Sequence, residues 1–124
     1  ALPSFLEGIN KITRGGMGIS FTSIAAASAA MDDADFQVYT KKMNTAAKQY
    51  LCEELTKMGY SYIPSYTNFV LFPVKMNGKE MLSKLASKGV GVRSFDIQNQ
   101  TYCRVSIGTM AEMKQFVSAF QQIS

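Results

Sequence analysis

Apolar residues recur at steps of three and four along one long stretch of the chain. The series is Phe36, Tyr39, Met43, Ala47, Tyr50, Leu51, Leu55 and Met58. This spacing predicts one amphipathic helix of about 25 residues, about 37 Å long. Asp32 and Asp33 mark its start, because acids are favourable at the N-terminal end of a helix, and Gly59 is in the usual stop position. The segments before and after this helix differ in their residue patterns, so the helix divides the chain into two parts.

Two shorter helices are expected before the long one. Residues 4–13 show helical spacing of apolar side chains, and residues 20–31 are rich in alanine with almost no charge. Small side chains let neighbouring backbones approach closely, so the alanine-rich helix should be buried on several sides. A chain of this size offers little to surround it, which hints at a larger body. The glycine-rich segment 15–18 is expected to be a turn, because it lacks the strand and the Lys-Ser/Thr ending of a phosphate-binding loop.

After Gly59 the pattern alternates between short strands and helices. Strands are expected at 61–63, at 67–72 (closed by Pro73), at 90–93 and at 102–107, and helices at 78–88 and from Thr109 to the end. Residues 96–101 read as a polar connection between the last two strands. The alternation predicts a small α+β or α/β layer, with a short sheet and helices against one face.

Composition excludes several classes of protein. The chain is 47% hydrophobic and 18% charged, as in a globular protein, and its net charge of +4 is spread without a basic block. A nucleic-acid partner is therefore not expected. The apolar run 24–31 is too short to span a bilayer, and the N-terminal residues do not resemble a secretory signal. We expect no membrane association and a cytoplasmic location.

The chemistry of a site is limited by the residue types that are present. The chain has no histidine, which excludes histidine-based triads and most zinc sites. Cys52 and Cys103 are not at metal-binding or redox spacing, so two reduced thiols are expected. Paired carboxylates and a nucleophile elbow are also missing from the pattern. We therefore expect no metal site and no catalytic residue of these kinds.

Two arginines stand out in the last pair of expected strands. Arg93 ends the first run and Arg104 lies inside the second. An arginine in an apolar strand is costly to bury unless a carboxylate or phosphate meets it. The acids nearby in sequence are Asp96 and Glu112, and Glu112 is expected to cap the last helix. The pair suggests a pocket for a small dianionic molecule. The alternative is that both guanidinium groups lie in solvent or pair with distant acids.

Three segments carry a resemblance to a known family. They are Asn-Phe-Val-Leu-Phe at 68–72, Gly-Val-Gly-Val-Arg at 89–93, and Cys-Arg-Val-Ser-Ile-Gly-Thr at 103–109, followed by Glu112 and Phe116. With them, the chain resembles the C-terminal third of a fold-type I pyridoxal-phosphate aminotransferase, most closely the histidinol-phosphate aminotransferases. The resemblance implies three parts: C-terminal helices of the large cofactor domain at 1–32, an interdomain helix at 33–59, and a small substrate-closing domain at 60–124. The sheet of that small domain would be mainly antiparallel.

The resemblance also implies roles for the two arginines. Arg104 is similar to the family arginine that binds the substrate α-carboxylate, and Arg93 aligns with the arginine that contacts the distal phosphate of histidinol phosphate. The two are 11 residues apart, a slightly shorter connection than the family's. The distal group that Arg93 contacts, the natural substrate and the amino donor therefore stay open.

By the same resemblance, the Schiff-base lysine and the other cofactor-binding residues belong to the large domain. Pyridoxal 5′-phosphate would be bound there, and the present fragment alone would be inactive. The parent would be a cytoplasmic homodimer that transfers an amino group between an amino acid or amino phosphate and a 2-oxo acid. Two alternatives remain: another enzyme of the same fold, such as a threonine-phosphate decarboxylase or another aminotransferase, and a freestanding regulatory α+β module that binds a small ligand.

Overall fold

The computed structural model describes residues 3–13 and 19–124. The chain divides into two compact units, residues 1–38 and 39–124, with the division inside the long helix. The expected glycine-rich turn at 15–18 lies outside the described residues. The predicted assignment of 1–32, 33–59 and 60–124 to parts of a larger enzyme stays a prediction.

The first unit contains helices α1 (Pro3–Thr13) and α2 (Phe21–Asp32) and the start of α3 (Ala34–Lys57). The Asp33 carboxylate accepts a hydrogen bond of 2.9 Å from the Phe36 amide, so Asp33 begins the long helix as expected. The prediction that the alanine-rich helix is buried on several sides is wrong for this chain. Every residue of α2 is exposed, including Phe21 at 90%. Small side chains allow close packing, but burial also requires neighbouring elements that cover them.

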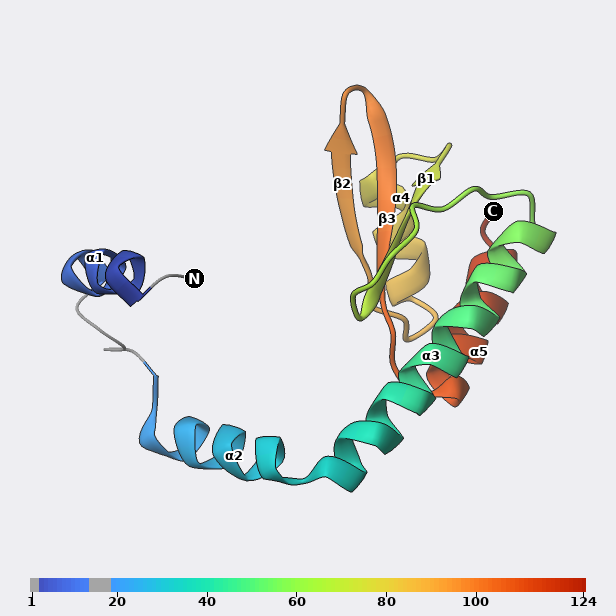
Figure 1. Ribbon diagram of the computed structural model, residues 1–124. Coiled ribbons are helices and arrows are strands. Elements are labelled where there is room, and N and C mark those ends of the chain that lie inside the picture. Colours follow the sequence, from blue (N-terminus) through green and yellow to red (C-terminus); the bar gives the residue numbers. More distant parts are fainter. Residues whose placement is uncertain (1–2, 14–18) are drawn as a thin grey trace. The chain divides into compact units, whose positions relative to one another are not determined.

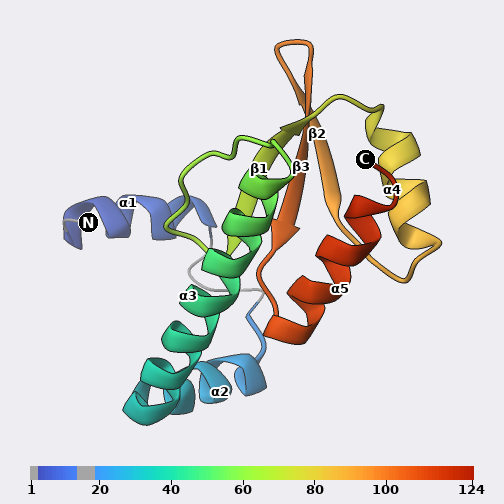
Figure 2. The same ribbon diagram turned by 90° about the vertical axis from the view of Figure 1, so that its right-hand side faces the viewer.

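The second unit is built on a three-stranded antiparallel sheet (Figure 1). Its strand order is β1 (Phe69–Val74), β3 (Gln100–Ser106) and β2 (Arg93–Ile97). Helix α3, helix α4 (Gly78–Ala86) and helix α5 (Met110–Gln121) pack against one face of this sheet (Figure 2). The predicted short antiparallel sheet with helices on one face is confirmed.

Alternate side chains of the sheet form one wall of the core. Val70, Phe72, Cys103 and Val105 are at most 3% exposed, whereas their strand neighbours lie on the opposite face, away from the helices. The helices complete the core with Ala47, Leu51, Leu55, Met81, Leu85, Met113, Phe116, Val117, Ala119 and Phe120. The Phe72 and Phe120 rings meet edge to face at a centroid distance of 5.4 Å. The sheet therefore has a filled inner face and an outer face that no helix of this unit covers.

Helix α3 ends as the sequence predicts. Gly59 takes a φ of 80°, a left-handed conformation that residues with a Cβ adopt only at a cost. The Tyr60 amide then donates to the Leu55 carbonyl at 2.9 Å, and the Gly59 amide donates to the Thr56 carbonyl at 3.0 Å. These two bonds form a Schellman cap, which satisfies the last carbonyls of the helix.

The connection between the last two strands differs from the prediction. Residues 96–101 were expected to be a polar loop, but Asp96 pairs with Thr101 and Ile97 with Gln100. The loop is only Gln98 and Asn99, with φ of 49° and 63°. Two successive positive φ values are typical of a type I′ turn, which usually carries Asn-Gly or Asp-Gly. The strand pair itself is as expected, but without a glycine the position of its turn is not evident from the sequence, and the first strand covers Arg93–Ile97 instead of residues 90–93.

The strand expected at 61–63 is reduced to one bridge, between Ile63 and Leu71. In contrast, β1 continues through Pro73 to Val74. Proline has no amide hydrogen to donate, but β1 lies at the edge of the sheet, where this donor is not required.

Candidate functional site

Arg93 and Arg104 are direct cross-strand partners on β2 and β3. Directly opposed residues of an antiparallel pair point to the same face of the sheet. Because their neighbours Cys103 and Val105 point into the core, both arginines lie on the outer face. The hairpin thus brings together the two residues that the sequence singled out.

Arg104 lies on the central strand and is half-buried. Its guanidinium carbon is 4.1 Å from the centre of the Phe69 ring, within the range of a cation–π contact. Its Nε atom is buried and has no hydrogen-bond partner among the described residues. A buried donor without an acceptor is costly, and within this chain the guanidinium of Arg104 is therefore not fully hydrogen-bonded.

The acids closest in sequence do not neutralise the arginines. Asp96 lies on the opposite face of the hairpin, where it accepts a hydrogen bond of 2.7 Å from the Thr101 hydroxyl. Glu112 accepts a hydrogen bond of 2.6 Å from the Thr109 amide in a capping box, as predicted. This backbone bond, with help from the Thr109 hydroxyl, lowers the pKa of Glu112 from its usual value.

Ion pairs within the described chain occur elsewhere. They join Lys57 to Glu54 and Lys84 to Glu80, and neither arginine takes part in one. Arg93 is exposed beside the half-buried Arg104. Two like charges on directly opposed positions destabilise a strand pair, and an anion that contacts both would relieve their repulsion.

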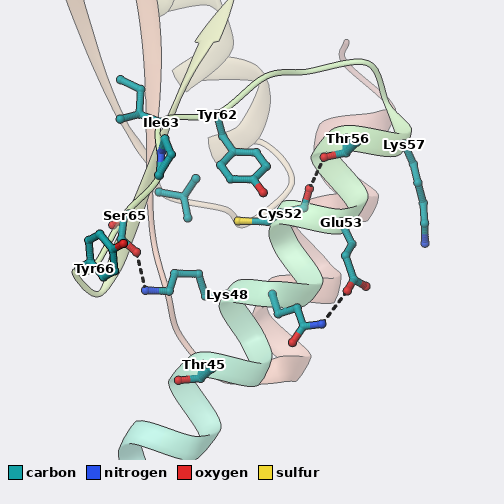
Figure 3. A pocket seen from close by; sticks show the side chains of 13 residues that line it. Thr45, Lys48, Cys52, Glu53, Thr56, Lys57, Tyr62, Ile63, Ser65 and Tyr66 are labelled. Carbon is teal, nitrogen blue, oxygen red and sulfur yellow. Dashed lines mark hydrogen bonds between the residues drawn. The ribbon is translucent and has the colours of Figure 1, made fainter.

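A separate open groove of about 770 Å³ lies between helix α3 and the loop before β1 (Figure 3). Cys52, Tyr62, Ile63 and Tyr66 are among the residues that line it, but neither arginine is. Burial raises the pKa of the Cys52 thiol, and the Tyr62 hydroxyl partly opposes that rise. A thiol with a raised pKa is a weak nucleophile, so this groove does not contain an activated cysteine.

Cys103 is likewise unsuited to catalysis. Burial in the core raises its pKa to about 12. Both cysteines are free, as expected from their spacing. Within residues 3–13 and 19–124, acids and cysteines form no cluster that could hold a metal ion, and no helix combines the length and apolar character that a membrane crossing requires.

Phe69 is the part of this site that sequence reasoning missed. Its position in an apolar strand was predicted, but the strand alternation does not reveal its partner. The contact with Arg104 depends on the register of β1 and β3, in which Leu71 is opposite Arg104 and Phe69 is two pairs further along, on the same face.

Comparison with known proteins places this geometry in context. The sequence is 37% identical to a histidinol-phosphate aminotransferase of Methylobacillus flagellatus over 98% of this chain and 33% of that protein. The solved structure of a candidate histidinol-phosphate aminotransferase from Erwinia carotovora atroseptica aligns with a TM-score of 0.76 and 32% identity, over 85% of this chain and 30% of that one. A decarboxylase from Sulfurospirillum multivorans shares the fold, with a TM-score of 0.71 and 18% identity, over 94% of this chain and 36% of that one.

The chain spans about a third of the length of the curated relatives it matches. The profile of one family, aminotransferase class I and II, matches residues 3–120, almost all of the sequence. The chain therefore belongs to the class I and II aminotransferases.

Proposed function

We propose that this chain is the C-terminal, substrate-binding part of a pyridoxal-phosphate-dependent aminotransferase of the histidinol-phosphate type. Membership of the aminotransferase family and the names of the relatives support this assignment. The observation that carries it is Arg104, a half-buried guanidinium on the open sheet face that forms no ion pair with a carboxylate among the described residues. The reaction would move an amino group between an amino acid or amino phosphate and a 2-oxo acid.

In this proposal Arg104 binds the carboxylate of the substrate. A planar guanidinium can donate two parallel hydrogen bonds to a carboxylate, which fixes orientation as well as position. Orientation and charge pairing of this kind contribute several kcal/mol to catalysis in enzymes. Arg104 would therefore set the direction in which the amino group faces the cofactor.

Arg93 would bind a second anionic group at the far end of the substrate. Its position directly opposite Arg104 supports this role, because one dianionic ligand could reach both cations on the same face. Its exposure suits a contact that forms only when substrate is bound. A phosphate is the distal group implied by the name of the relatives, and a second carboxylate would fit the same chemistry.

The residues of this chain do not fit the covalent attachment of the cofactor. Lys48 is the most enclosed lysine of the described chain, and its amino group donates to the Ser65 and Thr67 carbonyls at 2.9 and 3.0 Å. The other lysines are exposed on helices and loops. We therefore place the Schiff-base lysine in a part of the protein outside this sequence. We also propose that the isolated fragment is inactive, and that the whole protein to which it belongs is a cytoplasmic homodimer.

A decarboxylase is the second candidate. It is favoured only by the shared fold with the Sulfurospirillum multivorans enzyme, which is 18% identical. The same arginines could hold an amino acid from which carbon dioxide is lost. Carbon dioxide release without a requirement for a 2-oxo acid would distinguish this reaction from amino transfer.

The test uses the longest natural protein that contains these residues, called here the intact protein. The neighbouring coding sequence should contain the lysine segment of the cofactor domain. The purified intact protein should transfer amino groups from histidinol phosphate or an amino acid to 2-oxoglutarate. A natural gene that begins near Ala1, with ligand binding but no pyridoxal phosphate, would instead support the regulatory module.

A further inference from the structure

We propose that Phe69 is a positioning residue for anion recognition, which acts by holding the Arg104 guanidinium against its ring. This inference rests on the proposed carboxylate-binding role of Arg104 and adds a residue that determines how the role is performed. Phe69 itself does not contact the anion. It restricts where the two terminal nitrogens of Arg104 can point.

The register of the sheet brings the two side chains together. Phe69 pairs with Ser106 and Leu71 pairs with Arg104, so Phe69 is a diagonal neighbour of Arg104 on the outer face. The guanidinium carbon is 4.1 Å from the ring centre, a close contact for two groups on different strands. Long arginine side chains lose considerable rotamer freedom when they are fixed, and a flat aromatic surface reduces that freedom before a ligand arrives.

Because the Nε atom of Arg104 is buried, only part of its guanidinium group remains available for hydrogen bonds to a ligand. It is inaccessible to solvent and without a partner in the described chain, so a ligand cannot reach this nitrogen in the present arrangement. The terminal nitrogens are the remaining donors of the guanidinium. A carboxylate would therefore be met end-on by the two terminal nitrogens, which is one of the bidentate geometries that arginine offers.

Hydrogen bonds connect the backbone of Phe69, through the loop before β1, to helix α3. The Ser65 hydroxyl donates a hydrogen bond of 2.6 Å to the Phe69 carbonyl. Lys48 of α3 then holds the same loop through the Ser65 and Thr67 carbonyls, as Figure 3 shows for Ser65. The ring beneath Arg104 thus belongs to a segment tied to α3, which suits a rigid support.

The experiment compares four variants of the intact protein by their affinity for glutarate, a dicarboxylate that cannot react. Phe69→Leu removes the ring, Phe69→Tyr retains it, and Arg104→Ala removes the cation. Phe95→Leu is the matched control, because Phe95 is also a diagonal neighbour of Arg104 on the outer face, across β2, whereas the guanidinium lies over the Phe69 ring. Melting temperatures, together with kcat and KM for the amino-acid substrate, are measured for each variant.

We expect Phe69→Leu to weaken glutarate binding by about 2- to 30-fold, the range of a lost cation–π contact. KM should rise by a similar factor, while kcat should change by less than about threefold. Phe69→Tyr should bind glutarate nearly as well as the wild type, and Phe95→Leu should change binding by less than about twofold. If Phe69→Leu does not fold, Phe69→Met supplies a ringless side chain of larger volume with the same expectation.

Two outcomes would overturn the positioning role and leave the proposed function intact. In one, Arg104→Ala weakens binding but the ringless variants bind glutarate like the wild type. In the other, Phe69→Tyr loses as much affinity as Phe69→Leu, which indicates a general packing role. If Arg104→Ala itself binds glutarate normally, the proposed carboxylate site is wrong.

Discussion

The Cα positions of Arg93 and Arg104 are directly opposed on neighbouring antiparallel strands, and both side chains project from the outer sheet face. Strand pairing normally avoids two like charges in this arrangement, because they repel each other. The pairing is retained here although Asp96 faces the other way and Glu112 is occupied at a helix end. The proposed binding site for an anionic ligand would account for both cations.

Removal of the Arg104 guanidinium should impair catalysis by the intact protein. We expect Arg104→Ala to lower kcat/KM on the order of 100- to 1000-fold, since truncating one member of a buried charge pair costs about 2–5 kcal/mol. Arg104→Lys should recover only part of this loss, because lysine lacks the planar fork. Steady-state kinetics with the best amino-acid substrate provide the measurement. Turnover within about threefold of the wild type would contradict the carboxylate role.

Replacement of Arg93 should alter selectivity more than overall activity. If Arg93 binds a distal anion, Arg93→Ala should raise KM for a phosphorylated or dicarboxylic substrate by about 10-fold, as expected for the loss of a charge-assisted hydrogen bond worth about 1.5 kcal/mol. A monocarboxylic amino acid without a distal charge serves as the matched control substrate. Equal losses for both substrates would show that Arg93 does not discriminate between them.

The first turn of helix α4 packs against strand β2 through Gly78. A Cβ at this position would clash with the Ser94 hydroxyl. We expect Gly78→Ala to lower the free energy of unfolding by about 1–3 kcal/mol, the usual cost of overpacking. Gly91→Ala is the control, because a Cβ there would meet no atom within 4 Å. Denaturant unfolding of both variants measures the difference.

A second substitution separates this clash from other effects of alanine at position 78. In the Ser94→Gly background, the cost of Gly78→Ala should fall by at least about 0.5 kcal/mol, because the side chain that it meets is absent. Additive losses in the double variant would mean that the clash with Ser94 is not the cause.

The capping box at Glu112 should make stability depend on acid pH. Hydrogen bonds from Thr109 depress the folded-state pKa below the usual value of 4.5. The stabilisation is therefore present above about pH 4.5, and it is lost as the pH falls through the lower folded-state pKa. The stability difference between wild type and Glu112→Gln should be largest near neutral pH and should shrink in acid. Urea unfolding between about pH 3 and 7 measures it, and parallel curves for the two proteins would rule out this contribution.

Local patterns predicted much of the fold. The three- and four-residue spacing predicted helix α3, and the cap residues Asp33, Gly59 and Thr109 lie at the expected helix ends. These features could be predicted because each depends on residues within one or two helical turns. The same holds for the antiparallel sheet as a class of structure.

The pairing of the strands within the sheet could not be predicted from such local patterns. The hairpin turns at Gln98 and Asn99, and without a glycine the sequence gives little sign of two positive φ values. The contact between Phe69 and Arg104 depends on the pairing of β1 with β3, two strands separated in sequence by α4 and β2. Arg93 and Arg104 were predicted as site residues, but their direct opposition follows only from the observed register.

Strand β3 is hydrogen-bonded to a neighbouring strand on both sides, whereas β2 is hydrogen-bonded only to β3 within the sheet. Mutations at the β2–β3 tip can then change the length or charge of the outer strand with little disturbance to the inner one. Under the proposed roles of Arg93 and Arg104, this arrangement would allow descendants of the chain to acquire new distal specificities while the acid end of the substrate continued to be recognised.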